Sequence, residues 1–228
     1  MKLNGTSLNS RHNAFYDSDE VGDNHSFTSL ETPMRDDAFD LTNEEKINQI
    51  EHHFHQIMQI MGLNMEDESL SGTPRRVAKM YINELFSGLD PLHKPHPTLF
   101  SNHYDYNQML VEKNITFYST CEHHFVPIFG KAHVAYFSSG KVIGLSKLNR
   151  IVQYYAHRPQ VQERLTEQIA AELKEALHTE DVAVIMDANH MCVASRGVKD
   201  THSSTVTAAY YGKFKDLKVR EELLHYIR

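Results

Sequence analysis

ITFYSTCEHHFVPIFGKAHVAYF, residues 115–137, contains two strand-like stretches and a chemically unusual connection between them. Ile115, Phe117 and Ser119 alternate with neighbours of a different kind, which is typical of a strand, and residues 131–137 are predicted to form its partner. Residues 121–130 would then connect two antiparallel strands at one end of a sheet. Such a connection can present a short pair of ligand residues at the sheet edge.

Helical patterns flank this hairpin on both sides. Thr42 and Glu45 form a predicted capping box before apolar residues at helical spacing up to Gly62. A second helix is predicted with Thr73 as its N-cap and Pro74 as its first helical residue, and it should end near Gly88. Apolar residues at helical spacing return in 148–155 and 161–177. Alternating residues 182–186 and the stretch 205–211 predict two more strands, and residues 219–227 predict a short closing helix.

The resulting order is helices, two strands, two helices and two strands. It predicts an α+β fold in which a four-stranded antiparallel sheet carries helices on one face. Such a small sheet has open edges, which favour pairing with further copies of the chain into a ring. We expect a flexible N-terminal arm at residues 1–40, an N-terminal helical region at 41–90 and a catalytic domain at 91–228.

The composition argues against several classes of protein, including nucleic-acid-binding, membrane and disulfide-rich proteins. The chain has 228 residues, is 40% hydrophobic and carries a formal charge of -7, so no overall basic field favours nucleic acid or an anionic membrane as partner. Two cysteines cannot form a disulfide framework, and no apolar run has the length of a membrane span or secretory signal. We expect a cytoplasmic protein, in which thiols stay reduced.

Both cysteines have histidine neighbours, in Cys121-Glu122-His123-His124 and in His190-Met191-Cys192. Cys121, His124 and Cys192 are the ligand types that zinc prefers, and three protein ligands leave one position open, as in catalytic zinc sites. The alternative is that two buried cysteines act as small hydrophobic residues. A water in the open position would have its pKa lowered to about 7, which favours hydrolysis as the reaction.

Two further histidines lie beside these ligands. His123 and His190 are candidates for proton transfer, or for support of the ligands. His190 lies two residues before Cys192 on a predicted strand, so we expect both side chains on one face.

A basic helix start is a candidate anion site. Ser146 stands at the predicted helix start, followed by Lys147 and Arg150, and Arg196 could add a planar fork to the same phosphates. The alternative is an ordinary capped helix with solvated basic residues. Gln162 and Glu163 alone are ordinary first-turn residues.

Taken together, these motifs resemble those of GTP cyclohydrolase I. The resemblance runs from about residue 44 to about residue 214 and excludes the N-terminal arm. It is carried by STCEHHFVP at 119–127, GLSKLNR at 144–150, RPQVQERL at 158–165, His190-Met191-Cys192, TPRRVAKMY at 73–81 and FSGL at 86–89.

This resemblance implies conversion of GTP and water to formate and 7,8-dihydroneopterin triphosphate, the entry step to tetrahydrofolate and pterin synthesis in one-carbon metabolism. In that family zinc-bound water adds to the C8 carbon of guanine. The resemblance assigns zinc to Cys121, His124 and Cys192, and proton transfer to His123 and His190. It assigns the ribose rearrangement to Ser146, triphosphate binding to Lys147, Arg150 and Arg196, and guanine binding to Gln162 and Glu163. The guanine assignment is chemically sound, because a carboxylate accepts both N–H donors on the pairing edge of guanine.

The family has a tunnelling fold of ββααββ units, in which subunit sheets join into a barrel and two pentameric rings stack into a decamer. Its active sites lie between subunits, so we expect a homo-oligomer whose dissociated monomer is inactive. The resemblance predicts neither feedback inhibition nor a regulatory protein partner, and the role of the arm stays open.

Two rival hypotheses remain. One is another tunnelling-fold enzyme, such as a pterin synthase or the nitrile reductase that acts on a deazaguanine in queuosine synthesis. That reductase would need a cysteine nucleophile and a nicotinamide site, and no glycine fingerprint for a dinucleotide is evident. The other is a non-catalytic, zinc-stabilised scaffold that binds a nucleotide.

Overall fold

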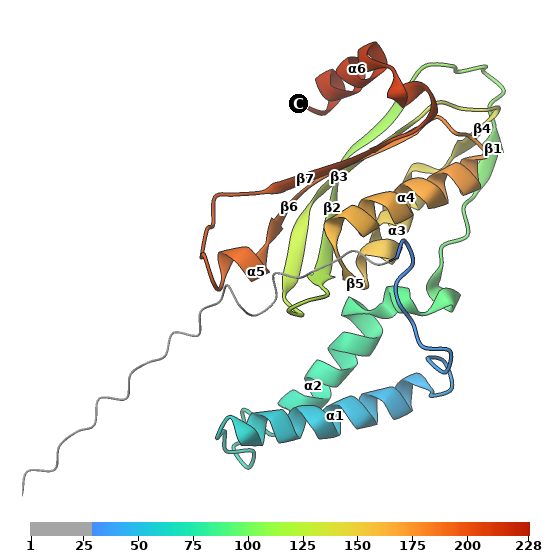
Figure 1. The fold of residues 1–228 in the computed structure, drawn as a ribbon. Helices are drawn as coiled ribbons and strands as arrows, with labels where there is room; N and C mark the ends of the chain where they lie inside the picture. Colours follow the sequence, from blue (N-terminus) through green and yellow to red (C-terminus); the bar gives the residue numbers. More distant parts are fainter. Residues whose placement is uncertain (1–28) are drawn as a thin grey trace, which may run out of the picture.

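The computed structural model of the protein describes residues 29–228. A curled sheet carries helices α3 and α4 on one face, and the pair α1 and α2 lies beyond one end of it (Figure 1). The helices are α1 (Asn43–Ile60), α2 (Thr73–Met80), α3 (Leu145–Ala156), α4 (Gln162–Leu177), α5 (Met191–Ala194) and α6 (Leu217–Ile227). This mixed architecture confirms the predicted α+β class.

Helix α1 begins with the predicted capping box. The Thr42 hydroxyl accepts from the Glu45 N–H at 3.3 Å, and the Glu45 carboxylate accepts from the Thr42 N–H at 2.8 Å. Helix α2 starts one residue earlier than predicted, since Gly72 is its cap and Thr73 is already helical. A π-helical turn, Tyr81–Leu85, continues α2 toward the sheet.

The main sheet has five strands rather than the four that were predicted. Its order is β5 (Pro159–Gln160), β2 (Leu110–Cys121), β3 (Pro127–Tyr136), β6 (Val182–His190) and β7 (Thr205–Tyr210). The four long strands are antiparallel as expected, whereas β5 pairs parallel to β2 through two residues only. Strands β1 (Leu99–Ser101) and β4 (Lys141–Ile143) form a separate small sheet.

The core lies between the sheet and helices α3 and α4. Its fully buried side chains include Phe117, Met186, Leu148, Ile151, Leu165 and Ile169. Strands β3 and β6 approach closely at Gly130, where a Cβ atom would lie 2.0 Å from the Asp187 carbonyl oxygen. Only glycine fits there, and the two strands pair in a register that sets His190 opposite Ile128.

The polypeptide before α1 already contacts helix α4. Gln168 donates to the Leu30 carbonyl at 2.8 Å, and Arg164 donates to the Ser29 carbonyl at 3.0 Å. These contacts with α4 begin well before the predicted boundary at residue 40. Residues 1–28 of the predicted arm lie outside the described part of the chain.

The described residues include no helix that is both long enough and apolar enough to cross a membrane.

Candidate active site

Chain direction brings four segments to one end of the sheet. Strand β2 ends at Cys121 and its partner β3 starts at Pro127, so the turn between them lies at that end. Strand β6 runs antiparallel to β3 and ends there too, at His190. The short strand β5 pairs with Cys121, and α4 begins at Gln162, directly after β5. The sequence motifs 121–124, 162–163 and 190–192 thus meet.

The loop that carries two of the candidate ligands, residues 121–126, is tightly bonded. The Cys121 N–H donates to Val126 O and the Phe125 N–H donates to Cys121 O, both at 2.8 Å, while the Glu122 N–H donates to Gln160 O at 3.1 Å. Phe125 has a φ of 54°, a left-handed conformation that costs free energy for a residue with a side chain. We call this segment the Cys121 loop.

Cys121, His124 and Cys192 form a cluster that could hold a metal ion. One potential ligand atom from each residue lies within 4.8 Å of the others. Cys121 Sγ is 3.7 Å from His124 Nδ1, and the Cys121 side chain is buried. Two sulfurs and one imidazole nitrogen are ligands that zinc prefers, so the residues fit a zinc ion.

The environment of the two thiols also suits a cation. Burial, together with the neighbouring Cys121, raises the pKa of the Cys192 thiol to about 11. Two adjacent thiolates in a partly buried site repel one another, and a divalent cation between them would offset that repulsion.

His190 is oriented by a buried glutamine. The Gln162 side-chain amide donates to Thr205 O at 2.8 Å and to Met186 O at 3.2 Å, which turns its oxygen Oε1 toward His190 Nε2 at 2.7 Å. His190 therefore donates from Nε2, and Nδ1 is the nitrogen left for other chemistry. Burial lowers the pKa of His190, and the negative charge of Glu163 opposes that shift.

The relation between His190 and Cys192 differs from the expectation. His190 is the last residue of β6, and Cys192 belongs to the short helix α5. Strand alternation therefore does not relate their side chains, and that part of the prediction is wrong. The helical turn brings the Cys192 sulfur back toward the Cys121 loop instead.

His123 and Arg196 also lie at the cluster. His123 Nδ1 is 3.8 Å from Cys121 Sγ, and Arg196 Nη1 is 2.8 Å from His124 Nε2. The structure thus brings one candidate phosphate ligand to the metal cluster.

The other candidate phosphate residues lie elsewhere in the same chain. Ser146, Lys147 and Arg150 belong to the first turns of α3, which starts after β4 at the opposite end of the sheet from α5 (Figure 1). Asn149 donates to the Glu112 carboxylate at 3.3 Å, near the start of β2. Strand β2 rises from there to Cys121 over roughly 30 Å, at about 3.3 Å per residue. One chain therefore does not unite the two halves of the predicted site.

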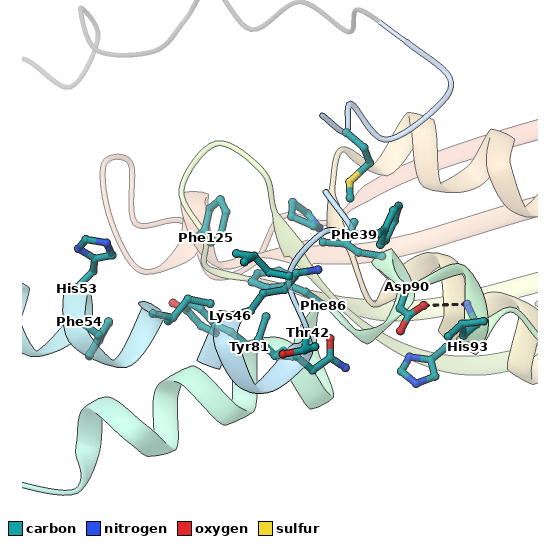
Figure 2. Close-up of a pocket in the computed structure, with 18 of the residues that line it drawn as sticks. Phe39, Thr42, Lys46, His53, Phe54, Tyr81, Phe86, Asp90, His93 and Phe125 are labelled. Atoms are coloured by element: carbon teal, nitrogen blue, oxygen red, sulfur yellow. Dashed lines mark hydrogen bonds between the residues drawn. The ribbon is translucent and has the colours of Figure 1, made fainter. Parts of the chain in front are cut away.

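An apolar cavity of about 740 Å³ lies beside the Cys121 loop, between α1, the π-helical turn and residues 34–41. Figure 2 shows Phe125 at its edge, near Phe86 and Tyr81. The Phe125 and Phe86 ring centroids are 5.4 Å apart, so the cavity wall also supports the loop. Its mostly apolar lining makes this cavity a poor site for a triphosphate.

Sequence reasoning gave no role to Arg164, whose side chain is 1% exposed and forms an ion pair with Glu122. The sequence did contain a signal for a buried ion pair, because Arg164 lies three residues after Val161 and four before Gln168, on the inward face of α4. A charge on an inward face needs a partner.

The comparisons with known proteins agree with the motifs. The sequence profile of the family described as GTP cyclohydrolase I matches residues 50–228. A GTP cyclohydrolase 1 from Flavobacterium johnsoniae is 59% identical over 210 residues, which cover 92% of this chain and 94% of the relative. One from Vibrio parahaemolyticus is 52% identical over 200 residues, 87% of this chain and 91% of the relative. Among solved structures, the apo form of the archaeosine synthase QueF-Like is 17% identical, with 44% of this chain and 90% of that chain covered at a TM-score of 0.38, too low to bear on function.

Proposed function

The chain belongs to the GTP cyclohydrolase I family, and we infer that it converts GTP and water to formate and 7,8-dihydroneopterin triphosphate. This is the first step of tetrahydrofolate and pterin synthesis. The observation that carries the inference is the Cys121–His124–Cys192 cluster beside His190, in a chain whose sequence matches the family over residues 50–228.

We propose that zinc is the metal of this cluster. Cys121, His124 and Cys192 would hold the ion, and their sulfur and nitrogen donors favour zinc over magnesium or calcium, which prefer oxygen. When bound, zinc supplies Lewis acidity that lowers the pKa of a water molecule. The cytoplasmic location stays a prediction, argued from the need to keep both thiols reduced.

His190 and His123 are the proposed proton-transfer residues. The bond from His190 Nε2 to Gln162 leaves Nδ1 to accept or return a proton, and burial favours the neutral ring that a base requires. Gln162 would thereby support catalysis by orienting His190. Its position next to Glu163 is the basis for the proposal that it also contributes to the guanine site. His123 lies on the Cys121 loop, with Nδ1 3.8 Å from Cys121 Sγ, and is proposed to handle a second proton of the hydration and ring-opening steps.

The substrate is proposed to span two subunits. Glu163 would accept the two guanine N–H donors, and Arg196 would bind the triphosphate. Lys147 and Arg150 from a neighbouring subunit would complete the phosphate site, and Ser146 would act in the ribose rearrangement. The separation of these α3 residues from Cys121 within one chain supports shared sites.

We also propose the assembly and domain plan of the family. The open edges of the sheet, at β5 and β7, support a tunnelling fold in which ββααββ units join into a barrel. A decamer of two pentameric rings and the three-part division at residues 40 and 90 remain proposals.

The test of the function uses GTP as substrate, with and without a zinc chelator. We expect formate and an oxidisable, fluorescent pterin without chelator, loss of both with it, and recovery when zinc is returned. Thermal unfolding should show that the chelated chain keeps its core. A non-catalytic zinc scaffold would release no formate and would unfold on chelation.

Glu163→Gln should chiefly damage guanine recognition. The amide offers one acceptor and one mismatched donor to the pairing edge, so we expect kcat/KM for GTP to fall by about 100-fold or more. Steady-state kinetics with GTP and ATP would measure the change, and Glu175→Gln on the exposed part of α4 is the control. Unchanged selectivity for GTP over ATP would contradict the assignment.

A further inference from the structure

The ion pair between Arg164 and Glu122 joins the helix that begins with Gln162 and Glu163 to the Cys121 loop. The Arg164 side chain is 1% exposed and that of Glu122 is 22% exposed. Arg164 Nη1 contacts Glu122 Oε2, and Nη2 donates to Glu122 Oε1 at 3.3 Å. The guanidinium therefore contacts both carboxylate oxygens. A bidentate contact of this kind fixes the orientation of the carboxylate as well as its distance from the guanidinium.

Glu122 lies between two candidate metal ligands in the Cys121 loop. It follows the candidate ligand Cys121 directly and lies two residues before His124. Its N–H is bonded to Gln160 O on β5, and its Oε1 lies 3.7 Å from His123 Nε2. With the backbone held on one side and the carboxylate on the other, the peptide that carries Cys121 and His124 has little freedom to turn.

The third nitrogen of Arg164 faces another segment. Nε donates to the Ser29 carbonyl at 3.0 Å, and the neighbouring Gln168 donates to Leu30 O at 2.8 Å. The Arg164 guanidinium thus contacts both the Cys121 loop and Ser29, while Gln168 holds Leu30 against the same helix. Lysine has a single compact charge and cannot make these contacts in the same geometry.

We propose that Arg164 is a positioning residue that fixes the Cys121 loop, through Glu122, in the arrangement in which its thiol and imidazole take the metal. The proposal rests on the proposed function only for the identity of the metal site, because binding of a metal can be measured without GTP. Residues that orient metal ligands from outside the ligand set typically contribute 10- to 100-fold in metal affinity or activity.

The competing explanation is that the Arg164–Glu122 ion pair stabilises the fold and has no effect on the metal site. Arg164→Met leaves the Glu122 charge without its partner and should destabilise the fold, whereas the double variant Arg164→Met/Glu122→Gln removes both charges. Replacement of both members of a buried ion pair often restores stability, since no uncompensated charge remains. Positioning predicts that the double variant regains thermal stability but not metal affinity.

The experiment measures zinc affinity by competition with a chelator and the visible spectrum of the cobalt-substituted protein, for the full chain. We expect zinc affinity about 10- to 100-fold lower in Arg164→Met and in the double variant, an altered cobalt spectrum, and an intermediate loss in Arg164→Lys. Among variants saturated with metal, kcat should fall more than KM rises. The matched control is Arg75→Met, which breaks the Arg75–Glu51 ion pair between α2 and α1 at 2.9 Å, away from the cluster.

Two results would overturn the proposal. One is a double variant with the zinc affinity and cobalt spectrum of the unmodified protein. The other is an Arg164→Lys variant, which keeps the charge if Arg164→Met fails to fold, with unchanged zinc affinity and spectrum. If the unmodified protein binds cobalt but releases no formate from GTP, the proposed function fails while the positioning test still stands.

Discussion

Replacing Cys192 with alanine is expected to abolish formate release from GTP. The variant keeps only Cys121 and His124 of the three-member cluster, and two ligands bind zinc far more weakly than three. We expect zinc affinity to fall by more than about 100-fold, the upper range for residues that merely orient ligands. Elemental analysis of the purified protein and a formate assay would measure both losses.

The fold should survive this change. Cys192 is only partly buried at the margin of the main core cluster, and alanine keeps its Cβ atom. Val193→Ala in the same short helix α5 is the matched control, since it shortens a neighbouring side chain outside the cluster and should keep zinc and activity. A Cys192→Ala protein that turns over GTP at the normal rate while free of zinc would end the metal assignment.

The sequence predicted local structure well because its signals are local. Thr42 and Glu45 lie three residues apart and form the capping box with no help from the rest of the chain. The alternation in residues 115–119 likewise reflects one buried and one exposed face of β2. The grouping of Cys121, His124 and Cys192 as a possible metal site was predicted from residue chemistry, since the chain has only two cysteines and both have histidine neighbours.

Features that depend on tertiary pairing escaped prediction. Strand β5 has two residues, Pro159 and Gln160, and no alternation can reveal so short a strand; it exists because β2 offers an unpaired edge beside Cys121. The turn after His190 was missed for a similar reason, because Met191-Cys192 has no helix signal of its own. Arg164 gave a signal, a charge on an inward helix face, but its partner Glu122 lies 42 residues away in sequence.

Contacts between subunits can be derived neither from the sequence pattern nor from the structure of a single chain. Lys147 and Arg150 are grouped with Arg196 by resemblance, yet α3 starts near the far end of the sheet from the Cys121 loop. If all three bind one triphosphate, the two groups must come from different copies of the chain. Strand pairing at the sheet edges is a physical route to such an arrangement.

Mixed oligomers of two defective variants are therefore expected to recover activity. Cys192→Ala removes a ligand from the proposed metal half of a site, and Arg150→Ala removes a proposed phosphate contact. Arg150 is exposed, so alanine should not disturb the fold. Alone, Arg150→Ala should lose about 10- to 100-fold in kcat/KM, the usual effect of one hydrogen bond to a charged group. When the two chains assemble together at equal ratio, about one site in four receives both intact halves.

This outcome separates shared sites from sites within one chain. Random assembly places an intact metal half beside an intact phosphate half with a probability of one half for each, so activity should approach about a quarter of the normal value. The two variants, each with its own affinity tag, would be co-expressed, purified through both tags in turn and assayed for formate. A site within one chain would always contain one of the two defects, so mixed oligomers would then be no more active than the average of the separate variants. Activity at that average in oligomers shown to contain both chains would contradict the shared site, because mixing would have supplied every contact that it requires.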